Sequence, residues 1–116
     1  MTPDTFILHI TTPAAWQSAQ RAGQYTLPSL ETEGFIHCSN ADQVARSANR
    51  FYADTSELLV LEIDPARLTS PLRIEPATSG ELFPHVHGPI NREAVVAIQS
   101  MHRADGRWVF PGPVEG

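Results

Sequence analysis

The chain contains no lysine and a single cysteine. The first shortage argues against binding to a long nucleic acid, and the second argues against a fold held by disulfides. All eight basic residues are arginines scattered along 116 residues, and 13 acidic residues bring the formal net charge to −5. Nucleic-acid backbones are bound mainly through clustered basic side chains, so we expect no long nucleic-acid partner. Single arginines still suit a small anion, because a guanidinium binds a phosphate or carboxylate through two parallel hydrogen bonds.

Other absences narrow the class of protein further. Cys38 has no second cysteine with which to form an internal disulfide, so the fold does not require an oxidising compartment. The sequence starts without a basic leader, and no apolar run approaches the roughly 18 residues of a membrane span. Gly-rich phosphate loops, Gly-x-Ser-x-Gly elbows and Cys-x-x-Cys pairs are also missing. We therefore expect one cytoplasmic domain over residues 1–116, with no membrane contact.

The first half of the chain predicts strands alternating with two helices. Residues 5–11 and 35–39 read as strands, and residues 24–27 as a short strand in a polar connector. Thr12 and Pro13 start an alanine-rich helix that Gly23 ends. Asn40 has the position of a cap for the second helix, with Gln43 in the place that a capping box requires, and an apolar stripe continues to Tyr52.

The second half predicts mostly strands. Residues 58–63 form the most apolar run, residues 72–75 alternate, and the β-branched run 94–101 favours a strand over a helix. Residues 80–90, with two prolines, read as a loop, and residues 105–111 as a hairpin return. Helices near the N-terminal half followed by strands indicate an α+β domain built on a curved, largely antiparallel sheet.

Two histidines lie near the ends of two apolar strands. Alternate side chains share a face of a strand, so His9 shares a face with Thr11, and His37 with Ser39. An imidazole binds polar ligands and moves protons near neutral pH, and we predict that these four residues line one cleft. The alternative is that both histidines are hydrogen-bonded core residues and that the two hydroxyls cap the helices that follow.

A second pair of histidines lies between two prolines. His85 and His87 share a face of a short extended piece, at the edge of the predicted cleft, and with His37 they form the candidate ligands of a three-histidine metal site. The His-x-His pair has no carboxylate or cysteine at a fixed spacing, so we expect no metal and keep this site as an alternative.

Three further residues are candidates for contact with a ligand. Glu93 stands just before the strand 94–101, where a carboxylate would stabilise positive charge; the alternative is a solvated turn residue. Tyr25 and Phe83 fall in connecting segments and have rings that stack on a flat ligand, although both are equally suited to the core and its rim.

Five blocks carry a family resemblance: residues 8–11 (LHIT), 33–39 (EGFIHCS), 59–64 (LVLEID), 83–90 (FPHVHGPI) and 105–106 (DG). Their order resembles the bacterial family known as domain of unknown function 952, and the resemblance extends over residues 5 to 111. The layout is more distantly similar to the ADP-ribosyltransferase superfamily. There a first strand carries a histidine followed two positions later by a hydroxyl, as with His9 and Thr11. The RNA 2′-phosphotransferase branch has His-x-Ser in its second strand, as in residues 37–39.

The superfamily resemblance implies a split sheet and NAD as a substrate. His9 and Thr11 would then hold a ribose, His37 would line the base or phosphate, and Glu93 would support an oxocarbenium-like centre. We accordingly expect an ADP-ribosyltransferase-like curved split β-sheet that binds NAD or another nucleotide and transfers ADP-ribose or acts on a ribose phosphate. The candidates are listed by role: catalytic His9, His37 and Glu93; ligand-binding Thr11, Ser39, Tyr25 and His85. The alternatives are a non-catalytic small-ligand-binding module and a histidine metal-binding protein.

Overall fold

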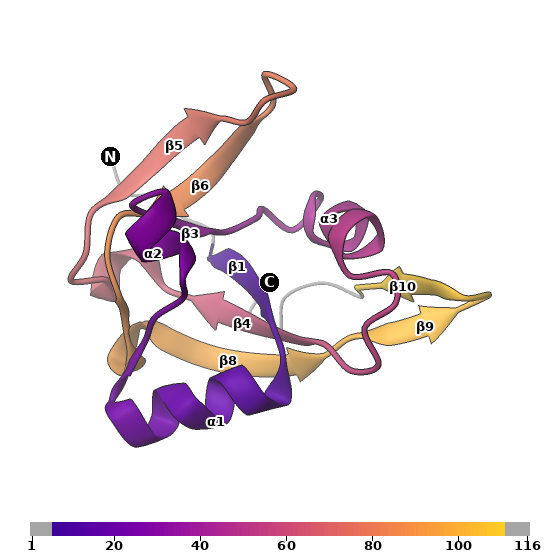
Figure 1. Ribbon diagram of the computed structural model, residues 1–116, viewed down its shortest axis with the longest axis horizontal. Helices are drawn as coiled ribbons and strands as arrows, with labels where there is room; N and C mark the ends of the chain where they lie inside the picture. The colour runs from indigo at the N-terminus through magenta and orange to yellow at the C-terminus, as the bar shows by residue number, and fades with distance from the viewer. Residues whose placement is uncertain (1–5, 111–116) are drawn as a thin grey trace.

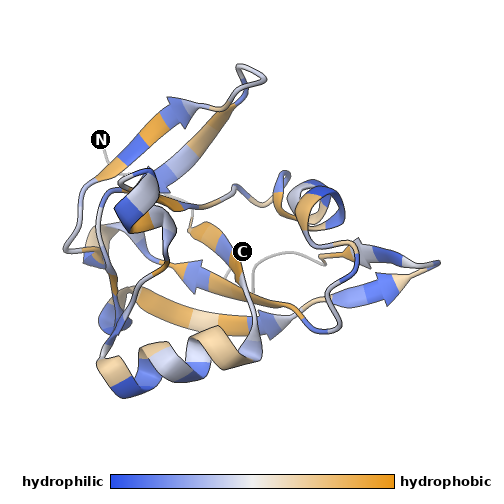
Figure 2. Ribbon diagram, in the orientation of Figure 1, coloured by the Kyte–Doolittle hydropathy of each residue, from blue (hydrophilic) through white to orange (hydrophobic). Residues whose placement is uncertain are grey.

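Four small antiparallel sheets and three helices make up the part of the chain that the computed structural model describes, residues 6–110 (Figure 1). One three-stranded sheet has the order β1 (Ile7–Thr11), β4 (Leu59–Ile63) and β8 (Val95–Ser100). The predicted strands in these three places are confirmed, and all the pairings are antiparallel. Hydrophobic colouring runs along much of β8 in Figure 2, whereas β5 alternates.

Helix α1 (Pro13–Ala22) covers one face of this sheet and begins and ends where the sequence predicts. The Thr12 hydroxyl accepts a hydrogen bond from the Ala15 amide, and Gly23 ends the helix in the left-handed region with φ of 82°. Trp16 packs here with the inward residues of the sheet. Ile7 belongs to this core, whereas Leu8 belongs to the core on the other face, so the predicted alternation along β1 is confirmed.

Helix α3 (Val44–Phe51) covers the opposite face, but it begins later than predicted. Asn40 was expected to cap the helix; residues 41–43 instead form a turn, although the Gln43 side chain does accept the Asn40 amide as a capping box requires. The other end of the Gln43 amide donates to the Leu82 carbonyl, which ties this turn to a distant hairpin. Val44 is fully buried, whereas Phe51, which the predicted apolar stripe included, is 69% exposed.

A second sheet has the order β3 (Ile36–His37), β6 (Leu82–Val86) and β5 (Leu72–Pro76). Its inner face adds Ile36 and Val86 to the core beside α1. The two main sheets meet at one bridge, where Leu8 and Ser39 exchange backbone hydrogen bonds of 2.8 and 2.7 Å. This junction carries the β3 segment from the second sheet onto the edge of the first.

The loop-rich segment predicted over residues 80–90 is wrong over most of its length, because β6 and part of β7 lie there, and the short extended piece predicted around His85 belongs to β6. Pro84 stands inside β6 without interrupting it: its carbonyl accepts the Cys38 amide at 3.0 Å. The amide hydrogen that Pro84 lacks would have completed this pair, and the ladder between β3 and β6 ends at that point. The proline therefore ends the pairing rather than the strand.

Shorter elements complete the described chain. They are β2 (Gln24–Tyr25) paired with β7 (Ile90–Asn91), the hairpin of β9 (His102–Ala104) and β10 (Arg107–Val109), α2 (Ser29–Thr32), and the 3-10 turns η1 (Pro65–Arg67) and η2 (Arg92–Ala94). The predicted tail hairpin is confirmed up to residue 110, and its expected end at Pro111 lies outside the described residues. Helix α2 was not predicted. No helix within residues 6–110 is long and apolar enough to cross a membrane.

Candidate ligand-binding cleft

His9, in the middle of β1, is the centre of a buried chain of hydrogen bonds. Its Nδ1 lies 2.6 Å from the His37 carbonyl, its Nε2 lies 2.9 Å from the Tyr25 hydroxyl, and that hydroxyl lies 2.7 Å from the Thr11 hydroxyl. His9, Thr11 and Tyr25 are each at most 4% exposed. All three side chains are therefore engaged with one another and with the backbone.

The direction of each hydrogen bond follows from the first. A carbonyl only accepts, so His9 carries its proton on Nδ1 and donates to the His37 carbonyl. Nε2 then accepts from Tyr25, which leaves the Thr11 hydroxyl to donate to the Tyr25 oxygen. Burial lowers the pKa of His9 to about 4, partly opposed by the bond to the carbonyl, and burial raises the pKa of Tyr25 to about 12. His9 is thus held as a neutral imidazole.

His37 has the opposite surroundings. It projects from β3 with its side chain 57% exposed, and its Nε2 lies 3.1 Å from the Glu33 carboxylate. The ring of Phe35, from the same face, stacks on His85 with centroids 4.0 Å apart and planes at 13°. His37 and His85 are directly opposite in the β3–β6 register, and their centroids lie 5.3 Å apart. An aromatic and imidazole surface therefore covers the outer face of this sheet.

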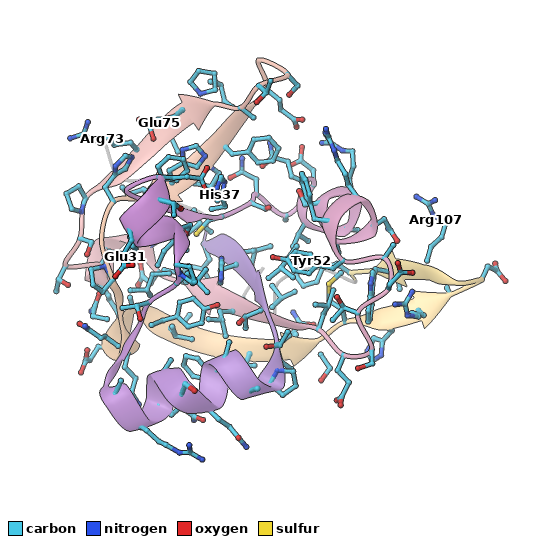
Figure 3. The ribbon with its side chains drawn as sticks, in the orientation of Figure 1. Glu31, His37, Tyr52, Arg73, Glu75 and Arg107 are labelled. Atoms are coloured by element: carbon cyan, nitrogen blue, oxygen red, sulfur yellow. The ribbon has the colours of Figure 1, made fainter. Side chains whose placement is uncertain are left out.

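A cleft of about 770 Å³ opens between this surface and helix α3. Its walls come from β1, β3, β6, α2, the connection from β5 to β6, and helix α3. Figure 3 shows His37 near α2 and Tyr52 near α3. The lining residues that offer aromatic or polar contacts are His9, Ser29, Glu33, Phe35, His37, Ser39, Arg46, Ser47, Arg50, Phe51, Tyr52, Thr78, Ser79, Glu81, Phe83 and His85. A cavity of this volume accommodates a ligand of mononucleotide size or larger.

Four of the predicted site residues meet in this cleft: His9, His37, Ser39 and His85. Thr11 and Tyr25 lie behind His9 and do not line it; Tyr25, expected in contact with a ligand's ring, is instead only 2% exposed. Glu93 lies on η2, exposed and away from the cleft lining. The strand that Glu93 precedes pairs with β4, on the far side of β4 from β1, which separates this carboxylate from the cleft.

Two arginines of α3 reach the cleft in different states. Arg46 makes a bidentate pair with Glu81, at 2.6 and 2.8 Å. That pair, with a further bond from Gln43, lowers the pKa of Glu81 to about 2. Arg50 lies 5.2 Å from the centroid of the Phe51 ring and forms no ion pair with any residue from 6 to 110. Arg50 is therefore the cation of the cleft that is available to an anionic ligand.

Residues that the sequence reasoning missed also lie near this site. Glu33 belongs to a family block, and the sequence does not predict that it pairs with His37. The local sign is the glycine between them, because Gly34 takes a φ of 87° in the turn that brings the two side chains together. Arg50 lies outside the apolar stripe of the helix, and the sequence gives no sign that it reaches a cleft. Glu75 offers no local signal, because its partners His85 and His87 reach it only through the β5–β6 pairing.

A family model described as "Protein of unknown function (DUF952)" matches residues 10–98. The chain belongs to this family. The crystal structure of protein CC0527 from Caulobacter crescentus resembles this DUF952 domain with a TM-score of 0.80 and 26% sequence identity, covering 90% of this chain and 94% of that one.

The solution structure of the same Caulobacter crescentus protein has a TM-score of 0.77 and 23% identity to the DUF952 domain described here, over 89% of this chain and 90% of that one. No curated protein matches the sequence. The predicted family is confirmed, and the mixed α and β architecture is shared with these structures.

Proposed function

We propose that the cleft binds a nucleotide, a flat base joined to a phosphate, and that NAD is the member of this class to test first. The single observation that carries the proposal is the meeting of His37, Ser39 and His85 in one cleft of about 770 Å³ with aromatic walls and an available arginine. Pockets of roughly 300–1,000 Å³ hold small ligands and cofactors.

The walls offer separate contacts to the two halves of such a ligand. Phe35 and Phe83 on the sheet side, and Phe51 on the helix side, present rings on which a base stacks. Arg50 supplies the guanidinium for a phosphate, because Arg46 is already held by Glu81. The hydroxyl of Ser39 lies along the same wall and adds a hydrogen bond to a sugar or phosphate oxygen.

The specific form of this proposal is an ADP-ribosyltransferase-like sheet that transfers ADP-ribose or acts on a ribose phosphate. Such a reaction needs an acid–base pair and a carboxylate at the cleft. His37 and Glu33 meet that need, since they lie 3.1 Å apart and both line the cleft. Glu93 does not line it. In this proposal Glu33 therefore replaces Glu93 as the carboxylate that stabilises a developing positive charge.

The second candidate is a binding module without turnover. The engagement of His9, Thr11 and Tyr25 with one another favours it, because none of the three has a free polar atom with which to hold a ribose. His9 remains in the wall of the cleft as part of its structure. Binding and catalysis are consequently tested separately.

The binding test uses the full chain after chelator treatment. AMP and then NAD are titrated into it, and the NMR signals of the backbone amides and the histidine rings report binding. We expect shifts at Ser39, His37 and His85. Arg50→Gln is expected to weaken binding roughly tenfold, the loss of about one charge-assisted contact. Arg107→Gln is the matched control, an exposed arginine on β10 that does not line the cleft, and it should leave the affinity unchanged.

Silence at millimolar AMP and NAD, or equal effects of the two arginine variants, would overturn the proposal. Nicotinamide release from NAD that is lost in His37→Ala and in Glu33→Gln supports the transfer activity. Binding without release in the unaltered protein supports the binding module and rejects the transfer.

A further inference from the structure

Outside the hydrogen-bonded network of His9, one cluster of histidines converges on a carboxylate. Glu75 lies on β5, and His85 and His87 lie on and just after the neighbouring strand β6. One carboxylate oxygen, Oε1, lies 2.9 Å from Nδ1 of His85 and 2.7 Å from Nε2 of His87. The three atoms all lie within 4.8 Å of one another. Two imidazoles therefore donate to the same oxygen.

We propose that Glu75, His85 and His87 form a binding site for a divalent transition-metal ion, with Zn²⁺ as the probe. This site goes beyond the proposed nucleotide binding and does not depend on it. His37 is not a ligand: its Nε2 is paired with Glu33 instead. The carboxylate that the His-x-His pair lacks in the sequence is supplied by the adjacent strand.

The spacing of the ligand atoms fits a metal centre. Nitrogen and oxygen ligands bind Zn²⁺ at about 2.0–2.2 Å, so two ligands are separated by roughly 3.0 Å at a right angle and roughly 3.4 Å at a tetrahedral angle. The two nitrogen–oxygen distances, 2.7 and 2.9 Å, need only a few tenths of an ångström of movement. The two ring nitrogens lie within 4.8 Å of each other, and a rotation of the more exposed His87 ring has to bring them closer. Two histidines and one carboxylate are also a donor set that transition metals accept with positions left for water or a substrate.

The fold holds these ligands before any ion arrives. Glu75 and His85 are set by the β5–β6 register, and the ring of His85 is stacked against Phe35 at 4.0 Å. The side chains of Glu75 and His87 are 33% and 25% exposed, whereas that of His85 is 6% exposed. One side of the cluster is thus packed and the other is open to solvent, as a site with free coordination positions requires.

One carboxylate and one nearby arginine set the charge around the cluster. Oε1 of Glu75 accepts a hydrogen bond from each imidazole, and the carboxylate is the anionic ligand of the three. Arg73, two residues earlier on the same strand, is the nearby cation, and Figure 3 shows it with Glu75 on β5. Binding moves the ring proton of His85 from Nδ1 to Nε2, and that of His87 from Nε2 to Nδ1, so that each neutral ring presents a lone pair to the metal.

The test is calorimetric titration of the untagged, chelator-treated full chain with Zn²⁺, repeated with Co²⁺ to read the ligand field by visible absorption. We expect one ion per chain. Glu75→Gln keeps a hydrogen-bond acceptor beside both histidines and is expected to preserve the fold, which circular dichroism checks. It should weaken binding by roughly 100-fold or more, since loss of an outer partner already costs about 10- to 100-fold. His87→Gln should weaken binding similarly.

The matched control is His37→Ala, which removes a more exposed histidine of the same surface. We expect it to leave the stoichiometry, the affinity and the Co²⁺ spectrum unchanged. The proposal is overturned if the unaltered chain binds no ion, if Glu75→Gln and His87→Gln bind as tightly as the unaltered chain, or if His37→Ala weakens binding as much as they do. The metal titrations contain no nucleotide, so their results can be interpreted even if the nucleotide titration fails.

Discussion

The histidines of the two three-stranded sheets differ in burial and in hydrogen bonding. His9 in the first sheet is buried, neutral and bonded through both ring nitrogens. His37, His85 and His87 in the second sheet gather around two carboxylates, Glu33 and Glu75, on a surface that solvent reaches. The first arrangement has no ring nitrogen left for a ligand, whereas the second offers several. Of these four histidines, the ones available to a ligand are therefore those of the second sheet.

The two groups are nevertheless joined through the backbone. The carbonyl that accepts the hydrogen bond from His9 belongs to His37, so the buried imidazole fixes the strand from which the exposed one projects. His9 is a positioning residue in this sense: its hydrogen bond holds β3 at the edge of the cleft. The comparison predicts that changes at His9 act on stability, and changes at His37 act on binding.

The largest effect is expected from truncating the buried histidine. His9→Ala leaves the His37 carbonyl and the Tyr25 hydroxyl without their partner and opens a cavity in a packed core. We expect a loss of about 3–4 kcal/mol in the free energy of unfolding, measured by urea denaturation. His37→Ala is the control, because it removes an exposed ring and keeps the carbonyl that His9 binds; its expected change is within about 0.5 kcal/mol. Similar losses in the two variants would break the comparison.

Lowering the pH should reduce the free energy of unfolding through His9 by nearly as much as the His9→Ala substitution does. The folded pKa of His9, about 4, lies below the value of about 6.5 for the unfolded chain, so the unfolded state binds the proton more readily between these values. Stability is full above pH 6.5 and falls as the pH drops toward 4, by about 3 kcal/mol from this residue. Below pH 4 both states are protonated, and this contribution no longer changes.

Urea midpoints at pH 7 and pH 4 measure this loss. His9→Asn serves as the matched variant, because its side-chain amide donates to the His37 carbonyl and does not titrate. We expect the difference in unfolding free energy between the two pH values to shrink by about 3 kcal/mol in that variant. An unchanged difference would show that His9 binds its proton equally well in the folded and the unfolded protein, contrary to its burial.

The first sheet was largely predictable because its signals are local. Alternation placed His9 and Thr11 on one face of β1, and the cap at Thr12 and the stop at Gly23 fixed α1. The partner of those two side chains was not predictable. Tyr25 reaches them through the pairing of β2 with β7, which joins residues more than 60 positions apart. A period of two residues says which face a side chain takes and nothing about which strand will face it.

The second sheet was hidden by proline and by long-range register. Pro84 made residues 80–90 resemble a loop, although the proline falls where the ladder to β3 ends and therefore costs little pairing. Glu75 meets His85 only because β5 and β6 form a hairpin in one register. The wall of the cleft formed by helix α3 was not predictable for a different reason. The apolar stripe of the sequence assigns Phe51 to the core, whereas the helix begins only at Val44 and its last turn carries Phe51 into the cleft.

The smallest of the expected changes isolates one atom of the buried network. Tyr25→Phe removes a hydroxyl that donates to His9 and accepts from Thr11, without opening a cavity of any size. Two buried polar groups then lack a partner, and we expect a loss of about 2 kcal/mol in the free energy of unfolding. Tyr52→Phe is the control, a tyrosine at the cleft whose loss should stay within about 0.5 kcal/mol. Because His9 makes no contact that the ligand needs, Tyr25→Phe should bind AMP as the unaltered chain does. Weaker binding in that folded variant would mean that the buried network reaches the ligand after all.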